Sequence, residues 1–240
     1  MMTSQNNIKV IAISGLARAG KDTFVSIAKN ILVKNGYTGI RVAFADALKE
    51  EVQQMLSDNK FSLDIAHITP EEKEQVRPLF VFWGCQRRLE SHDGLYWVKK
   101  AEDKIKFCYE STGSPYSNLD RNKMVFLVSD VRFPNEARWV HEKFDGDVIH
   151  LRKYSVHTSE SPAIVYGVSS NVEFHRVYDD PPNEEERKQD PLVREIADQR
   201  IDWEKSSSGD VLTDSNLNNI VINALNNTKY FKHTSNGILS

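Results

Sequence analysis

The sequence lacks the features that are typical of several classes of protein. Its 240 residues include only two cysteines, too few for a disulfide framework, and no Cys/His spacing resembles a zinc site. The longest uninterrupted apolar stretches, such as residues 79–83, fall far short of the ~20 residues of a membrane-spanning helix. There is no internal repeat, and the 11 glycines and 8 prolines exclude a fibrous or low-complexity chain.

A charge excess of one sign is also missing. The chain carries 31 Lys and Arg against 34 Asp and Glu, a net charge of −3, so it offers no overall field for a nucleic-acid polymer. The polar first seven residues lack the basic and then apolar profile of a signal peptide, which favours a cytoplasmic location. With 40% hydrophobic residues, the chain is expected to form one globular domain over residues 1–240.

Short apolar runs alternate with amphipathic segments along the first half of the chain. Residues 9–14 are almost continuously apolar, as in a strand covered on both faces of a parallel sheet. The alternation predicts an α/β fold in which a parallel sheet is flanked by helices. The expected strands are 9–14, 40–44, 124–129, 147–152 and 211–213, and the expected helices are 22–35, 46–56, 69–89, 95–108, 134–143, 184–199 and one from about 216.

Residues 154–205 differ from the rest in charge. They contain 12 acidic residues against 6 Lys and Arg, a net charge of −6, so the remainder of the chain carries +3. We expect a surface excursion there, which is either a solvated loop and helix or a lid that covers a site.

The segment Gly15-Leu16-Ala17-Arg18-Ala19-Gly20-Lys21-Asp22-Thr23 follows the first predicted strand and precedes the first predicted helix. It has the glycine and lysine spacing of a Walker A sequence in the right structural context. Glycines let the backbone curl and expose its N–H groups, the helix start adds positive potential, and a lysine supplies a charge for the β- and γ-phosphates. The hydroxyl that normally follows the lysine arrives one residue late, as Thr23, because Asp22 stands in its place.

A second polar group closes the predicted strand 124–129. Asp130, Arg132 and Glu136 follow it, and the carboxyl ends of parallel strands share one edge with the phosphate loop. Arg132 could engage phosphate while Asp130 and Glu136 orient an acceptor, or Arg132 and Glu136 could form an ion pair that caps a helix. By position alone, Asp130 could instead be a carboxylate near magnesium.

In these two motifs, and in residues 77–98, the chain resembles the phage deoxynucleoside monophosphate kinases of the P-loop kinase family. The resemblance implies a three-layer, adenylate-kinase-like P-loop NTPase fold with a helical acceptor-binding region at 57–122 and an acidic lid at 154–205. It implies transfer of the ATP γ-phosphoryl group to a deoxynucleoside monophosphate with Mg²⁺ present. The family includes dimers, so a homodimer is one expectation for this chain.

The resemblance also implies a set of site residues. Lys21, Arg132 and Asp130 are the expected catalytic residues, and Asp22 is the expected metal ligand. The acceptor is expected to contact Arg77, Gly84, Trp97, Asp130, Arg132 and Glu136. ATP is expected to contact Gly15, Ala17, Arg18, Ala19, Gly20, Lys21, Asp22 and Thr23.

The residues of the acceptor region can be read without the resemblance, and alternatives remain open. Arg77 is a candidate ligand of the acceptor phosphate, and Trp97 is either a stacking surface for a base or part of the core. Val81, Cys85 and Ala19 replace polar residues that are frequent in the family, which leaves the base preference open. A phosphomevalonate-type kinase and a P-loop ATPase without an acceptor are the rival functions.

Overall fold

The computed structural model describes residues 7–160, 172–205 and 214–232, and within them a mixed sheet forms the centre of the molecule. Its strands are β1 (Lys9–Ser14), β2 (Thr38–Val42), β3 (Met124–Val131), β4 (Asp147–Glu160), β5 (Val172–Tyr178) and β6 (Gln199–Glu204). Neighbouring strands follow the order β2-β3-β1-β4-β5, and β6 also pairs with β4. The pairs β1–β3, β1–β4, β2–β3 and β4–β6 are parallel, whereas β4 and β5 are antiparallel.

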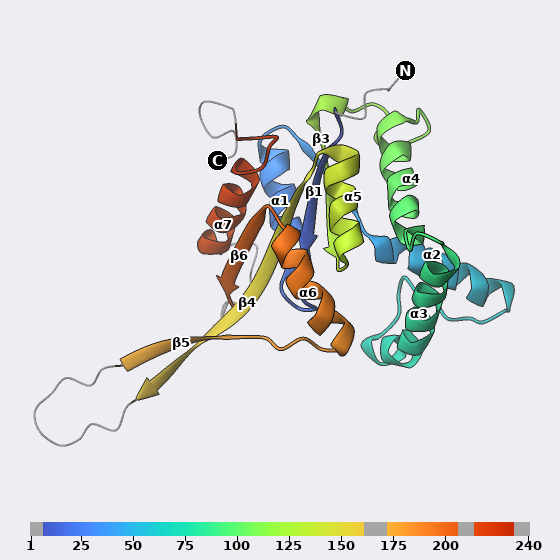
Figure 1. Ribbon diagram of the computed structural model, residues 1–240. Coiled ribbons are helices and arrows are strands. Elements are labelled where there is room, and N and C mark those ends of the chain that lie inside the picture. Colours follow the sequence, from blue (N-terminus) through green and yellow to red (C-terminus); the bar gives the residue numbers. More distant parts are fainter. Residues whose placement is uncertain (1–6, 161–171, 206–213, 233–240) are drawn as a thin grey trace, which may run out of the picture.

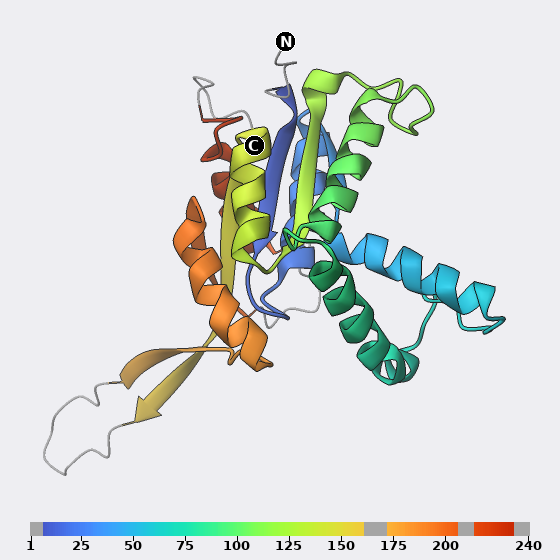
Figure 2. The same ribbon diagram turned by 45° about the vertical axis from the view of Figure 1, so that its right-hand side comes forward.

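Helices cover both faces of this sheet. In the described residues they are α1 (Lys21–Lys34), α2 (Phe44–Asp58), α3 (Pro70–Glu90), α4 (Tyr96–Glu110), α5 (Pro134–Phe144), α6 (Glu184–Ile196) and α7 (Ser215–Asn226). Helices α1 and α7 lie on one face, and α4, α5 and α6 lie on the other (Figure 1). Helices α2 and α3 project from the edge where β1 and β3 end, as Figure 2 shows.

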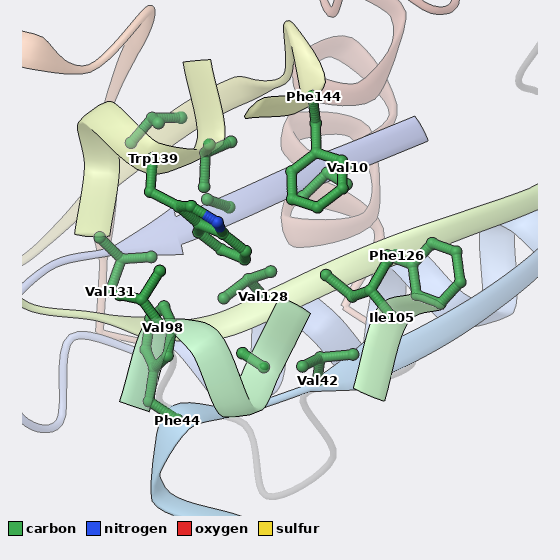
Figure 3. Close-up of a cluster of buried hydrophobic side chains, with 14 of the residues drawn as sticks. Val10, Val42, Phe44, Val98, Ile105, Phe126, Val128, Val131, Trp139 and Phe144 are labelled. Carbon is green, nitrogen blue, oxygen red and sulfur yellow. The ribbon is translucent and has the colours of Figure 1, made fainter. Parts of the chain in front are cut away.

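The strands divide their side chains between two hydrophobic clusters. Along β1, Val10 and Ala12 join the cluster beneath α4 and α5, whereas Ile11 and Ile13 join the cluster beneath α1 and α7. Figure 3 shows the first cluster, in which the Trp139 ring of α5 lies close to the strand valines. Cover on both faces therefore explains the unbroken apolar run at residues 10–13 of β1, and the α/β prediction is confirmed.

Several local predictions are confirmed almost to the residue. Helix α3 begins with a capping box, because Thr69 Oγ1 accepts from the Glu72 N–H while the Glu72 carboxylate accepts from the Thr69 N–H. Helix α1 ends where Gly36 adopts a φ of +75°, which is the left-handed conformation expected after a helix. The predicted strand 211–213 lies outside the described residues.

The expectation of a purely parallel sheet is wrong at one end. Strand β4 continues to Glu160, well beyond the predicted end at residue 152, and pairs with β5 as an antiparallel hairpin that projects from the body (Figure 1). The acidic region also contributes β6 to the parallel part of the sheet, where a helix was predicted to reach residue 199. Charged residues in β6 obscured the alternation of apolar and polar positions that is typical of a strand. In the structure Trp203 is buried, and Asp202 is paired with Arg152.

No helix in the described part of the chain is both long and apolar enough to cross a membrane.

The turn between β1 and α1 is fixed against β4 and β6 by two glycines. Gly15 has a φ of +131°, and a Cβ there would lie 2.2 Å from the Leu151 carbonyl oxygen. Gly20 has a φ of +92°, and a Cβ there would lie 2.4 Å from the Trp203 ring. The Trp203 indole N–H also donates to the Ala19 carbonyl at 2.8 Å, so β6 holds this turn in place.

We predict that Gly20→Ala lowers the free energy of unfolding by more than about 2 kcal/mol, because it adds a steric clash to an unfavourable backbone conformation. Urea unfolding followed by circular dichroism measures this loss. Gly36→Ala is the matched control, since Gly36 also has a positive φ but nothing lies within 4 Å of an added Cβ. Its expected cost is about 1 kcal/mol, and equal losses in the two variants would contradict the role assigned to Trp203.

Candidate functional site

A cleft of about 490 Å³ opens at the edge of the sheet where β1 and β3 end. The turn after β1, the start of α1, the start of α2, one face of α3 and the first half of α6 form its walls. Such an edge position is where open α/β sheets bind ligands. The lining side chains are Ala17, Arg18, Lys21, Asp22, Arg41, Phe44, Ala45, Leu48, Lys49, Lys73, Arg77, Phe80, Val81, Gly84, Cys85, Arg88, Trp97, Ser129, Asp130, Arg132, Phe133, Glu136, Asn183, Glu185, Glu186 and Gln189.

The cleft is basic although the chain as a whole is acidic. Eight lysines and arginines line it against five carboxylates, a net charge of +3 in a chain whose net charge is −3. Its apolar lining is concentrated at α2 and α3, which contribute side chains such as Leu48, Phe80 and Val81. A ligand with an anionic part and a flat apolar part would match both halves.

Of the residues predicted to contact a nucleotide, Ala17, Arg18, Lys21 and Asp22 line the cleft. Gly15, Ala19, Gly20 and Thr23 belong to the same turn and helix start but are not part of the lining. The turn contains three positive φ angles, at Gly15, Arg18 and Gly20, so its backbone curls as the motif predicts.

The Lys21 ammonium lies inside this curl. Its Nζ donates to the carbonyl oxygens of Gly15 at 2.7 Å and Leu16 at 2.8 Å. Burial and, next, the nearby Arg132 charge lower the pKa of Lys21 to about 8, while the neighbouring carboxylates oppose this shift. An anion bound beside Nζ would stabilise the charged form of the lysine and would therefore raise its pKa.

Asp130 lies at a break in the regular strand pairing. The register between β1 and β3 shifts between Ala12 and Ser14, and such irregularities re-aim side chains at the ends of strands. Both carboxylate oxygens of Asp130 accept backbone N–H groups at 2.9 Å, one from Phe44 and one from Ala45. Asp130 therefore fixes the start of α2 against the cleft, in addition to lining it.

Glu136 is the most buried acid of the cleft, with 2% of its surface exposed. Its carboxylate accepts the backbone N–H groups of Arg132 at 2.8 Å and Phe133 at 3.1 Å, and it pairs with the Arg88 guanidinium at 3.1 Å. Burial raises the pKa of Glu136 to about 7, although Arg88 and the backbone donors favour its ionised form. The pair predicted between Glu136 and the Arg132 side chain is replaced by a bond to the Arg132 backbone.

The Arg132 guanidinium points to α6 instead. Its Nη1 donates to Glu186 Oε1 at 3.2 Å, and the other oxygen of Glu186 accepts the Ala17 N–H at 2.8 Å. The acidic region thus forms one wall of the cleft and meets the turn after β1 directly. The Arg132 side chain remains 48% exposed, so it has room to reorient.

The residues predicted to contact an acceptor also reach this cleft, with different exposure. Arg77 lies on the exposed face of α3 and pairs with Glu74. Trp97 is only 3% exposed, and its indole N–H donates to the Gly84 carbonyl at 3.1 Å. The core-packing alternative therefore describes most of the Trp97 ring, and it leaves little of that ring for stacking with a base.

The described residues contain no cluster of three or more His, Cys, Asp or Glu side chains arranged to hold a metal ion. Mg²⁺ commonly binds to proteins through one or two carboxylates together with substrate phosphates and water. Asp22 is an exposed carboxylate on the cleft wall, and it fits that limited role.

Four residues of the site escaped the sequence analysis. Arg88 is partly buried, and its guanidinium carbon lies 4.0 Å from the centroid of the Phe133 ring. Glu186 and Trp203 each form a hydrogen bond with a residue more than 160 positions away in the sequence, and no local sequence pattern predicts such a contact. Ser129 lines the cleft at 2% exposure, and its Oγ is the one buried side-chain polar atom without a hydrogen-bond partner in the described part of the chain.

Comparison of the chain with protein-family models and with curated proteins finds no match.

We predict that Glu136→Ala lowers the free energy of unfolding by about 3 kcal/mol, because it leaves buried donors and the Arg88 charge without an acceptor. Urea unfolding at pH 8 measures the loss. Glu90→Ala is the matched control: this exposed glutamate, on the helix that carries Arg88, pairs with Arg87 at 3.3 Å, and its removal should cost less than about 1 kcal/mol. Similar costs for the two variants would show that Glu136 does not organise the cleft.

Proposed function

We propose that the protein is a deoxynucleoside monophosphate kinase with a P-loop NTPase fold, which transfers the γ-phosphoryl group of ATP to a deoxynucleoside monophosphate. The observation that carries this proposal is that one basic cleft contains both polar groups of the sequence. Lys21 belongs to the glycine-rich turn, Asp130 lies near the end of β3 and Arg132 follows that strand, yet all three line the same cleft. A triphosphate and an acceptor phosphate bound there would face each other.

The charge of the cleft supports two anionic substrates. Its eight basic side chains exceed its carboxylates by three, and a cleft of about 490 Å³ falls in the size range of small-molecule sites. The turn after β1 would bind the donor phosphates through backbone N–H groups and Lys21. The apolar wall of α2 and α3 would hold the acceptor nucleoside, with Phe80 more accessible than the buried Trp97.

Phosphoryl transfer depends mainly on alignment and on neutralisation of charge. In this proposal Arg132 and Arg88 lie nearest the migrating group and the acceptor phosphate, and Ser129 offers an unused hydroxyl. Asp130 and Glu136 keep the walls in place through the N–H groups that they accept. No general base is required, because the acceptor phosphate oxygen is already anionic near pH 7, as in a phosphorylated side chain with a second pKa of about 6.

Mg²⁺ would accompany ATP, and Asp22 would offer it an exposed carboxylate of the cleft lining. When bound, the ion would neutralise charge on the β- and γ-phosphates.

The decisive experiment is a product screen with ATP, Mg²⁺ and each common NMP and dNMP. We predict ADP release that depends on a dNMP acceptor, and a loss of kcat of at least about 100-fold in Lys21→Met. Lys34→Met, which removes an exposed lysine from the last turn of the same helix, should leave the rate unchanged. ADP release that no acceptor stimulates would favour an ATPase, and phosphorylation of a small non-nucleotide phosphate would favour a phosphomevalonate-type kinase.

We also predict that affinity for ATP falls as the pH rises above about 8. The pKa of Lys21 is lowered to about 8 in the protein without nucleotide, so the lysine loses its charge above that pH. Bound phosphates raise this pKa again, so that binding between pH 8 and 10 takes up a proton. Isothermal titration calorimetry in buffers of different ionisation enthalpy measures the uptake. In Lys21→Met the same uptake should be absent, and its persistence would assign the proton to another group.

A further inference from the structure

The contact between α6 and the turn after β1 joins two groups that the proposed function assigns to phosphate. Glu186 Oε2 accepts the Ala17 N–H at 2.8 Å, and Glu186 Oε1 accepts from Arg132 Nη1 at 3.2 Å. We infer, on the basis of the proposed function, that the Glu186 carboxylate occupies a phosphate position in the cleft and must leave before a polyphosphate binds there. Glu186 then acts as an internal competitor of the donor nucleotide.

The chemistry of this exchange is simple. A carboxylate and a phosphate are both anions whose oxygens accept from backbone N–H groups and from guanidinium groups. The Glu186 side chain is only 11% exposed, and its charge also acts on the nearby Lys21. One set of donors cannot serve both anions at the same distances, so the two compete for it. The phosphate of a polyphosphate carries more charge, and it gains more from the same donors.

Helix α6 is anchored at one end and held to the cleft at the other. Val193 is fully buried, and Asp190 pairs with His150 of β4 at 2.9 Å. In the first turn, Glu186 makes the hydrogen bonds to the turn after β1 and to Arg132, and the Asn183 side chain caps its N–H. Pro191 follows Asp190 directly and has no N–H to bond the carbonyl of Arg187, so one backbone hydrogen bond is missing between Glu186 and the anchored residues. The helix is therefore weakest where its first half would turn away from the cleft.

Release of Glu186 would also change Arg132. Its guanidinium loses its partner when Glu186 leaves, and at 48% exposure it can turn toward a phosphate. Binding of the donor and orientation of an acceptor-side cation are thereby coupled through one carboxylate.

The test measures affinity for two probes, ATP with Mg²⁺ and inorganic tripolyphosphate, by isothermal titration calorimetry. Glu186→Ala is expected to lower both dissociation constants by about tenfold, because a charged hydrogen-bonded competitor is removed. Glu186→Gln should lower them less, since its amide oxygen can still accept the Ala17 N–H.

Glu184→Gln is the matched control for charge, as Glu184 is an exposed residue of the same helical turn that pairs only with Arg187 in the described part of the chain. It should bind both probes within about twofold of the unmodified protein, since an exposed pair contributes little.

The outcomes separate this inference from the proposed function. If the unmodified protein binds ATP and Glu186→Ala binds it equally or more weakly, Glu186 is not a competitor, and the kinase proposal stands. If neither probe binds to the unmodified protein or to any variant, both proposals fail. Circular dichroism and a thermal midpoint for each variant verify that the fold is retained.

Hydrogen exchange provides a second readout in the unmodified protein. Saturating ATP should increase exchange in the first half of α6, residues 184–190, and leave α7 unchanged, because only the former loses its contact. In Glu186→Ala this increase should already be present without ATP. Greater protection of residues 184–190 on ATP binding would overturn the inference, since it would mean that α6 closes onto the nucleotide.

Discussion

The cleft depends on one kind of interaction, in which a carboxylate accepts backbone N–H groups. Asp130 accepts two at the start of α2, Glu136 accepts two in the turn after β3, and Glu186 accepts one in the turn after β1. Each bond satisfies donors that would otherwise be unpaired near a partly buried site. Carboxylates therefore hold the walls of the cleft together, and two of them, Glu136 and Glu186, also pair with the guanidinium groups of Arg88 and Arg132. The three acids differ in how firmly the elements that carry them are held in place. Asp130 and Glu136 hold together elements that are packed in the core, whereas Glu186 lies on the first turn of a helix whose anchoring residues, Asp190 and Val193, come later.

The steric fit beneath the glycine-rich turn is the second constraint. Gly15 lies against the Leu151 carbonyl of β4, and Gly20 lies against Trp203 of β6. The loop that would hold phosphate is thus supported by strands that follow it by more than 130 residues. The acidic region has two roles as a consequence, because β6 supports this loop from below while α6 closes the cleft beside it. A region whose charge suggested only a surface excursion or a lid is part of the framework of the site.

Much of the fold could be predicted from the sequence where the signal is local. The capping box at Thr69, the glycine at the end of α1 and the apolar run of β1 each predict an element, because backbone geometry and periodicity act over a few residues. Prediction failed for β6, whose alternation is masked by charges that find their partners elsewhere in the chain. The start of α2 was misplaced by two residues, since the groups that cap it belong to Asp130, 86 residues away.

The sequence by itself determined the chemistry that is available: a glycine-rich turn with Lys21 between a strand and a helix, and a group of acidic and basic residues at the end of β3. Such motifs can be recognised in the sequence because their residues are neighbours in the chain. Only the tertiary structure decided which of these groups share a cleft and what each side chain bonds. In that structure the Arg132 guanidinium donates to Glu186, and the Glu136 carboxylate accepts backbone N–H groups. Most of the Trp97 ring is buried beside Gly84. Those choices depend on desolvation and on contacts between distant segments, neither of which is encoded in local spacing.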